Sequence, residues 1–552
     1  MRSGIIVTAA LLASTQSVHA QVFTTGGQIQ QIPPAPVAPK PVPDLQLAPR
    51  TPAPDSGPAG APIQVTALRI TGATLFSEPV LIAAGGFTPG SSLTLRDLRG
   101  IAGRISAYYN SRGYFLAQAY LPQQDIRDGV VTIAVIEGRY GKVGVQNHTN
   151  LSPRIANGVL AGLDKDDVVT SAPLERRLLL LSDIPGVRVH STLAPGTEVG
   201  TTDLLVDLAP APRISGSVEA DNAGNRYTGT YRFGGAINLN DPTGLGDMVS
   251  LRILASTEGL AYGRAAYQVP IGNLTVGVAY AHFRYDLSHE FESLDASGKA
   301  DIISAFASYP LIRSRSGNLY AVAAFDAKKF VDRVDLTQSE SDRRSLVGTL
   351  GLNADWRDHI GGGGATTATI GWSIGNLDIE SPVERAVDDI TAHSNGGFNK
   401  ILFSASRLQQ IAGPLSLYGA VRGQIAFNNL DSSEKMELGG AYGVRAYPEG
   451  EAYGDQGYIA TAEARLRLAP RGIPGQFQLI GFVDVGEVQY AHSPWFAGSN
   501  SAHRSGIGGG LSWAGPAGIL ISATYATRLG SQPVTSQPDR AGRAWFQIVK
   551  LF

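Results

Sequence analysis

The chain has 552 residues, of which 43 % are hydrophobic, 45 are basic and 47 are acidic, and it has no cysteine. This length predicts two to four domains, and the balanced charge argues against a nucleic-acid binder, which usually carries a basic surface. The lack of cysteine excludes thiol nucleophiles, Cys-ligated zinc, iron–sulfur clusters and disulfides. Glycine is abundant at 66 residues, and charged residues make up only 17 %. Such a composition is typical of many β-strands joined by tight turns.

The first twenty residues have the pattern of an export signal. Arg2 supplies a positive start, residues 5–13 form a short apolar run, and residues 18–20 resemble a small-residue cleavage site. The run is much shorter than the roughly 20 apolar residues of a membrane-spanning helix. A buried hydrophobic helix is the alternative interpretation, which the glycines and prolines that follow disfavour. Residues 1–20 are therefore predicted to be a signal peptide.

Residues 21–62 combine a short polar segment with a proline-rich linker. Eleven prolines fall among residues 33–62, which predicts an extended, semi-rigid chain because proline cannot donate backbone hydrogen bonds. A linker of this length implies that the preceding segment, residues 21–32, reaches a distant site. Its threonines and glycines at positions 24–27 disfavour a helix there.

Two small α+β units are predicted next, over residues 63–138 and 139–210. In the first, a strand near 65–70 precedes helices at 77–84 and 94–111, and strands at 114–121 and 130–135 follow. The second repeats this order. Its expected elements are a strand near 143–145, helices at 153–161 and 173–181, and a hairpin of strands 187–193 and 203–208.

Residues 211–552 show apolar and polar side chains in strict alternation, in segments of about ten residues. Ile370, Trp372 and Ile374, for example, alternate with small or polar residues such as Ser373. About 340 residues divided into repeats of about 21 gives about sixteen strands, the signature of a membrane β-barrel. Several strands also carry charges that would need a polar lumen: Arg232, Arg252, Glu463 and Arg465.

The sequence therefore predicts a mainly β fold, with a C-terminal transmembrane β-barrel of about 16 antiparallel strands preceded by two small α+β domains. A soluble β-sandwich or a propeller array is the alternative. The last residue, Phe552, ends an alternating strand, as expected for a barrel.

Enzyme signals are weak. Residues 371–375 match the G-x-S-x-G pattern of a nucleophile elbow, but they lie in the middle of a predicted strand, whereas the elbow needs a strand–turn–helix context. The glycine run 361–364 lacks the lysine of a phosphate-binding loop, and the nine histidines show no metal-binding spacing. No catalytic residue, metal or cofactor is expected.

Several motifs resemble those of two-partner secretion transporters (TpsB type), the haemolysin secretion/activation family of outer-membrane proteins. Residues 109–114, 121–126 and 135–138 resemble the first POTRA (polypeptide-transport-associated) domain of that family, and residues 174–187 resemble its second. Residues 221–229 resemble its opening barrel strands. The periplasmic residues carried by this resemblance are Gly113, Tyr114, Pro122, Glu137 and Gly138.

Two further motifs are more specific. Residues 440–448 with Gly454 and Asp455 resemble the VRGY motif at the tip of a loop that folds into the lumen, and residues 482–486 resemble the inward-facing F-x-D-x-G motif. The transport residues implied by the resemblance are Val444, Arg445, Ala446, Tyr447, Phe482, Asp484 and Gly486. Ala446 stands where the commoner motif has glycine. A carboxylate inside a barrel needs a partner, and the resemblance makes Arg445 that partner of Asp484.

The resemblance implies a protein that binds an unfolded exported partner in the periplasm and passes it through the barrel. It implies a large secreted cargo, β-helical in this family, together with outer-membrane lipid and a barrel assembly machinery that acts through Phe552; no nucleic acid is expected. Residues 21–32 would plug the lumen. The alternatives are an insertase for outer-membrane proteins, a passive porin, and a membrane-tethered hydrolase.

Overall fold

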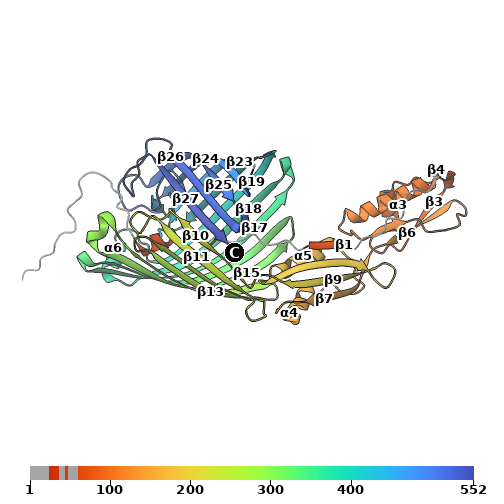
Figure 1. Cartoon of the computed structure of the whole chain (residues 1–552), viewed down its shortest axis with the longest axis horizontal. Helices are drawn as coiled ribbons and strands as arrows, with labels where there is room; N and C mark the ends of the chain where they lie inside the picture. The colour runs from red at the N-terminus through yellow and green to blue at the C-terminus, as the bar shows by residue number, and fades with distance from the viewer. Residues whose placement is uncertain (1–23, 37–43, 48–59, 471) are drawn as a thin grey trace, which may run out of the picture.

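The computed structural model describes residues 24–36, 44–47, 60–470 and 472–552 (Figure 1). The predicted signal peptide and most of the proline-rich linker lie outside these residues. Among the described residues, no helix is long and apolar enough to cross a bilayer.

The first small domain packs two helices against a short sheet. Its elements are β2 (Ile63–Val65), β3 (Ala67–Thr71), α2 (Glu78–Gly85), β4 (Ser91–Leu93), α3 (Leu95–Asn110), β5 (Gln118–Tyr120) and β6 (Val130–Ile136). Helix α3 begins at a capping box in which Thr94 and Asp97 bond each other's backbone N–H groups. Its apolar face, including Ile101 and Ile105, packs on Ile133 of β6 in a continuous core.

Strand β5 is shorter than the predicted strand 114–121. The backbone turns after Tyr114, where the N–H of Ala117 donates to the Tyr114 carbonyl at 3.1 Å. The Tyr114 ring instead packs edge-on against Tyr109, with the centroids 6.0 Å apart. Pro122, which has no N–H to donate, follows the strand closely.

The second small domain has the same kind of architecture. Its elements are β7 (Arg139–Asn147), α4 (Pro153–Leu160), α5 (Ser171–Ser182), β8 (Val187–Pro195) and β9 (Thr201–Pro210). The sheet has the order β1-β8-β9-β7, in which β1 (Asp44–Leu47) comes from the segment predicted as linker and pairs in parallel with the edge of β8. Figure 1 shows β1 beside this domain.

The rest of the chain forms a closed barrel of sixteen strands, which confirms the predicted fold class. Consecutive strands pair antiparallel, and β27 closes on β10 through five residue pairs. The strands are β10 (Ile214–Asp221), β11 (Arg232–Asn240), β12 (Met248–Ser256), β13 (Ala261–Ile271), β14 (Leu274–Asp286), β15 (Ala296–Arg313), β16 (Gly317–Val334), β17 (Ser339–Asp358), β18 (Gly364–Ile379), β19 (Gly396–Ala412), β20 (Leu415–Ala426), β23 (Gln456–Leu468), β24 (Gln476–Gln489), β25 (Ser501–Ala514), β26 (Ile519–Arg528) and β27 (Gly542–Leu551).

The alternation along the strands sorts side chains between the outside and the lumen. On β18, Ile370 and Trp372 are half-exposed on the outer surface, whereas Ser373 is buried and bonds Thr349. The predicted lumen charges also find partners inside: Arg232 bonds Asp221 at 2.8 Å. Period-two patterning thus separates an apolar outer belt from a polar interior.

The two ends of the barrel are distinguished by where the small domains attach. Strand β9 ends at Pro210 and β10 begins at Ile214, so the second domain lies at the end where β10 begins, which we call the near end. The far end holds the connections 222–231 and 529–541 and helix α6 (Pro382–Asp388). Short 3₁₀ turns complete the connections: η1 (His289–Leu294), η2 (Asp335–Thr337), η3 (Ile360–Gly362), η4 (Ser432–Glu434) and η5 (Pro516–Gly518).

Two segments fill much of the lumen. One is the inserted loop, residues 427–455 between β20 and β23, which contains the small hairpin β21 (Met436–Glu437) and β22 (Tyr453–Gly454). The other is helix α1 (Thr25–Ile29), drawn in red inside the barrel in Figure 1. This helix forms despite the poor propensity of its sequence.

Candidate functional site

The tip of the inserted loop is bound to the barrel wall by an arginine and an aspartate. Arg445 donates to Asp484 from Nε and Nη2, both at 2.8 Å, and from its backbone N–H at 3.2 Å. Asp484 is fully buried on β24 and accepts a fourth hydrogen bond from Thr461 at 2.9 Å. This is the two-point contact that a planar guanidinium makes with a carboxylate.

Two more wall residues complete the seat of Arg445. Its Nη1 lies 2.9 Å from Glu463 on β23, and its guanidinium carbon lies 3.4 Å from the centroid of the Phe482 ring. Phe482 and Asp484 therefore face the lumen from one strand, as the alternation predicts. The pairing of Arg445 with Glu463 was not predicted, although Glu463 had stood out as a charge on an alternating strand.

Ala446 is accommodated by Gly506 on the adjacent strand β25, which pairs with Asp484 in the sheet register. Its side chain is buried, and it does not have a positive φ. A methyl group built on Gly506 of β25 would lie 2.5 Å from the Ala446 Cβ, so the absence of a side chain at 506 leaves the space that Ala446 fills. Gly486 works in the same way, since a methyl group there would lie 2.7 Å from Leu438 of the loop.

The flanking motif residues fix the backbone of the tip. The Val444 N–H donates to the Leu438 carbonyl at 3.0 Å, and the Tyr447 hydroxyl donates to the Gln532 carbonyl at 3.0 Å. Both side chains are fully buried. From β27, Trp545 adds a bond from its Nε1 to the Arg445 carbonyl at 2.7 Å.

Buried ion pairs anchor the rest of the inserted loop. Glu451 accepts from Arg504 of β25 at 2.9 and 2.6 Å. Lys435 lies 2.5 Å from Asp455 within the loop. The sequence shows that these residues are charged but not which of them lie together in the fold, so the pairs were not predicted.

Helix α1 is bound to the wall through its first turn. Thr24 caps the helix by accepting from the Gly27 N–H, and Thr25 donates from both its N–H (2.8 Å) and its hydroxyl (2.5 Å) to Asp332 of β16. Asp332 is in turn paired with Arg343 of β17. The cap and the contacts with the barrel wall therefore stabilise a helix whose residues have low intrinsic helix propensity.

Helix α1 and the inserted loop also contact each other. Thr24 donates to Ser432 at 2.6 Å, and the Gln30 amide donates to the Ser432 carbonyl at 2.8 Å. The Gln31 amide donates to the Tyr453 hydroxyl at 2.7 Å. A methyl group on Gly26 would lie 2.6 Å from Ser433, so glycine permits close packing. The two segments form a single obstruction, beside which cavities of about 580 and 400 Å³ remain.

The motif predicted in the first small domain surrounds a buried glutamate. Glu137 accepts backbone N–H groups from Thr74 (2.7 Å) and Leu75 (2.9 Å) and the hydroxyl of Tyr109 (3.0 Å). Burial alone would raise the pKa of Glu137, but these hydrogen bonds outweigh it and hold the pKa below its usual value. The charged carboxylate therefore stabilises the folded domain.

The two glycines of that motif lie where the small domains meet. Gly113 and Gly138 have φ of 89° and 75°, in the region that favours glycine. Their carbonyls accept backbone N–H groups of the second domain, from Ser171 at 3.0 Å and Val169 at 2.9 Å. The motif thus joins the domains.

The second domain is fixed to the near end of the barrel by a charged clamp. Arg313, at the end of β15, donates from Nε (2.7 Å) and Nη2 (2.9 Å) to Asp183, which directly follows α5. Arg176 of α5 donates to the Pro310 carbonyl at 2.8 Å. The sheet edge that carries β1 is therefore held in a defined position relative to the lumen.

The side chains of the lumen bind the two inserted segments, and these segments obstruct the lumen. Among the described residues, no group of three His, Asp or Glu side chains is placed to hold a metal ion. A barrel with a polar interior and paired domains at one end suits the passage of a large polar chain, and the two inserted segments occupy its lumen in this structure.

Comparisons with known proteins agree with this architecture. The haemolysin secretion/activation family ShlB/FhaC/HecB matches residues 200–512, and the ShlB-type POTRA domain matches residues 63–138. The heme/hemopexin transporter protein HuxB of Haemophilus influenzae (strain 86-028NP) is 29 % identical over 476 residues, which cover 84 % of this chain and 82 % of that protein.

Two further similarities extend over most of the chain. The outer membrane transporter CdiB of Dickeya dadantii is 24 % identical over 453 residues, 80 % of this chain and 76 % of CdiB. The solved structure of CdiB from Escherichia coli shares the fold, with a TM-score of 0.70 at 20 % identity over 92 % of this chain and 93 % of that one. The chain thus belongs to the ShlB/FhaC/HecB family of haemolysin secretion/activation proteins, and it is an outer-membrane two-partner secretion transporter with its POTRA domains in the periplasm.

Proposed function

We propose that the structure is the resting state of the transporter, and that the exported partner opens it by taking the place of β1 on the edge of β8. The observation that carries this proposal is the pairing of β1 with β8, in register from Asp44 opposite His190 to Leu47 opposite Leu193. An extended peptide that adds a strand to a sheet edge gains affinity from backbone hydrogen bonds. The same edge cannot hold β1 and a cargo strand together.

The position of β1 in the chain couples this exchange to the lumen. Helix α1 ends at Ile29 and β1 begins at Asp44, so one short connection joins the obstruction of the lumen to the sheet edge. While β1 is paired, that connection is fixed at both ends. Loss of β1 from β8 removes one of the two attachments and leaves α1 held by its contacts with the inserted loop and with the rest of the barrel, among them Asp332 and Thr228.

The Arg313–Asp183 clamp supports the same function. It fixes the second POTRA domain at the periplasmic end, so a strand captured on β8 begins its path at a defined place beside the lumen. The motif residues Arg445, Phe482 and Asp484 act in this proposal as the fastening of the inserted loop, which must move or be bypassed during export. A passive porin has no use for two fastened inserts, which disfavours that alternative.

The test weakens β1 without touching the barrel. A double substitution, Leu45→Pro with Gln46→Pro, removes backbone donors from β1 and should raise the affinity of the full-length transporter for the N-terminal fragment of its secreted partner. It should also raise the ion conductance of the transporter in planar bilayers. The matched control, Leu45→Ala with Gln46→Ala, keeps the backbone donors and should change neither quantity. Unchanged affinity in the proline variant would refute competition at this edge.

The cargo itself is proposed to be a large secreted protein of β-helical type. Support comes from recognition through a sheet edge, which suits a partner that will itself fold into β-structure, and from the family to which the chain belongs. HuxB is named as a heme/hemopexin transporter and CdiB only as an outer membrane transporter, so membership of the family does not by itself identify the cargo. Comparison of culture-medium proteins with and without the transporter identifies the cargo directly, and an unchanged medium would contradict the proposal.

We also propose that the barrel assembly machinery inserts this chain into lipid through its last strand. The Phe552 side chain is half-exposed, and its backbone bonds Gly216 of β10 at 2.9 and 3.0 Å, which closes the barrel. Phe552→Ser should lower the amount of folded barrel in the outer membrane while leaving the synthesis of the chain unchanged. Equal amounts of both folded proteins would exclude this role for Phe552.

A further inference from the structure

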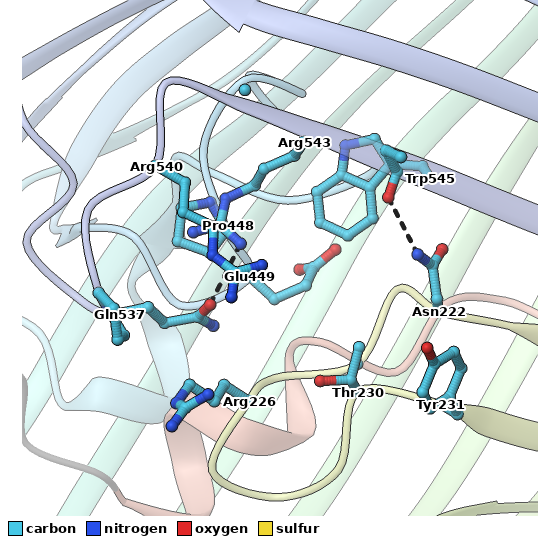
Figure 2. A pocket seen from close by; sticks show the side chains of 14 residues that line it. Asn222, Arg226, Thr230, Tyr231, Pro448, Glu449, Gln537, Arg540, Arg543 and Trp545 are labelled. Atoms are coloured by element: carbon cyan, nitrogen blue, oxygen red, sulfur yellow. Dashed lines mark hydrogen bonds between the residues drawn. The ribbon is translucent and has the colours of Figure 1, made fainter.

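An arginine-lined cavity of about 300 Å³ lies at the extracellular end of the lumen, and no part of the mechanism above uses it (Figure 2). Three segments meet there: the connection 222–231, the inserted loop, and the connection 529–541 with the start of β27. The cationic side chains that line it are Arg226, Arg540 and Arg543. They approach the cavity from two sides, Arg226 from one and the other two from the opposite side.

Arg543 presents an unused binding edge to this cavity. Its Nη1 donates to Gln537 at 3.2 Å, but its Nε and Nη2 are buried and have no hydrogen-bond partner among the described residues. Buried donors of a charged group are costly when they are left unpaired. Nε and Nη2 together form the edge with which a guanidinium grips an oxyanion at two points.

The protein uses that same edge elsewhere. Arg445, Arg504 and Arg313 each bind a carboxylate through Nε and Nη2, at distances between 2.6 and 2.9 Å. The Nε and Nη2 donors of Arg543 thus resemble those of the other three arginines with the aspartate or glutamate partner removed.

Other charges around the cavity leave the edge open to an external group. Arg226 bonds Glu290 at 2.8 Å, and Arg540 is exposed. Glu449 also lines the cavity, but its carboxylate accepts the Ala441 N–H at 2.8 Å within the inserted loop. Besides Arg226, two arginines, 540 and 543, line the cavity, and Glu449 is the one acidic residue among the described residues that line it.

The side from which a ligand arrives follows from the alternation of β27. Ala544 and Phe546 are exposed on the outer surface of the barrel, whereas Trp545 bonds the Arg445 carbonyl inside the lumen. Arg543 has the parity of Trp545 and faces the lumen as well. A lipid headgroup in the surrounding bilayer is on the wrong side of the wall, while a chain leaving through the lumen passes this cavity.

We propose that Arg543, assisted by Arg540, is a binding site for an aspartate or glutamate side chain of the exported partner as it emerges. This inference rests on the export function. A carboxylate held at the outer mouth would oppose backward movement of the unfolded chain while the segment ahead of it folds outside. Since the contact is between charges at a solvent-accessible mouth, it weakens as salt rises.

The test measures binding without relying on export. Decapeptides of glutamate and of glutamine are titrated into the purified full-length transporter in detergent, and dissociation constants are compared between the wild-type protein and Arg543→Gln. The substitution should weaken glutamate-peptide binding by about tenfold or more, because a two-point charged contact is lost, and should leave glutamine-peptide binding unchanged. Arg333→Gln, which makes the same charge change at an exposed pair with Glu340, is the matched control and should have little effect.

Two outcomes overturn the proposal. The first is equal glutamate-peptide affinity in the wild-type and Arg543→Gln proteins. The second is a site that takes inorganic phosphate but not the peptide, which would indicate a phosphate ligand instead. Retained heat-modifiable migration on gels shows that the variant is folded, and a normal binding result with absent export in cells would place the fault in the export proposal and not in this site.

Discussion

Replacing Arg445 with alanine should release the tip of the inserted loop and stop export while the barrel still folds. Asp484 is fully buried and accepts four hydrogen bonds, of which the Arg445 side chain supplies two. The substitution leaves Asp484 with only backbone and threonine donors, and it leaves Glu463 without its bond to Arg445. Loss of one partner from a buried ion pair costs about 3–5 kcal/mol, which is large beside the contribution of a single uncharged hydrogen bond of the loop, about 0.5–1.5 kcal/mol.

The assay is the amount of partner protein in the culture medium, with the folded barrel measured in isolated outer membranes. Arg445→Ala and Asp484→Ala should both reduce export strongly at a normal barrel level. Arg445→Lys should restore it only in part, because an ammonium group cannot make the planar two-point contact. Arg344→Ala, which removes an exposed arginine 3.0 Å from Glu380, is the control and should export normally.

A charge exchange between the two positions tests direct pairing, and the structure dictates how it must be built. Arg445→Asp with Asp484→Arg alone would place the new aspartate beside Glu463, which lies 2.9 Å from the present guanidinium. The exchange should therefore rescue export better when Glu463→Gln is added. Normal export by both single alanine variants would refute the reasoning, since the pair would then have no part in transport.

Three further predictions address other contacts. Gly506→Ala should impair export, because its methyl group would lie 2.5 Å from Ala446 Cβ, and Ala446→Gly in the same chain should restore it; failure of this rescue in the medium assay would contradict the steric explanation. Asp183→Ala should reduce export because it removes the ion pair with Arg313. A disulfide built across this clamp in the otherwise cysteine-free chain should leave export intact. Loss of export in the disulfide variant would show that the domain must detach from the barrel. Glu137→Gln should make the stability of the first POTRA domain depend less on pH in the acid range, as measured by hydrogen exchange of α3. The folded pKa of Glu137 is lowered, so its carboxylate stabilises the fold above the unfolded pKa of about 4.3, and this contribution is lost as the pH falls through the folded pKa. Parallel pH curves for the two proteins would contradict it.

Period-two alternation was enough to predict the barrel and the facing of its residues. Phe482 and Asp484 were placed in the lumen by the alternation of β24 together with the family motif, and the count of about sixteen strands matches the closed sheet. These features are local, because each strand must present one face to lipid and one to water. The partner of Asp484 came from the family resemblance, and its role in transport stays a prediction.

Contacts between segments that are distant in the chain could not be predicted from the sequence. Helix α1 contains Gly26 and Gly27, which argue against a helix by propensity, yet packing on Ser433 needs a residue without a side chain at position 26. The fit of Ala446 against Gly506 spans sixty positions along the chain, and neither residue signals the other. The parallel pairing of β1 was hidden for the same reason, since a four-residue strand in a proline-rich segment has no pattern of its own.

The covalent link between the lumen helix and the first POTRA domain has a kinetic consequence. Helix α1 ends at Ile29 and the ordered domain begins at Ile63, so a helix that leaves the lumen remains tied to the transporter by about thirty residues. The effective concentration of the tethered helix at its binding site is set by the length and stiffness of the linker and is independent of how many copies the cell contains. In the proposed mechanism, reclosure after each passage is therefore an intramolecular reaction, and the departing cargo, not the return of the helix to its binding site, sets the duration of the open state.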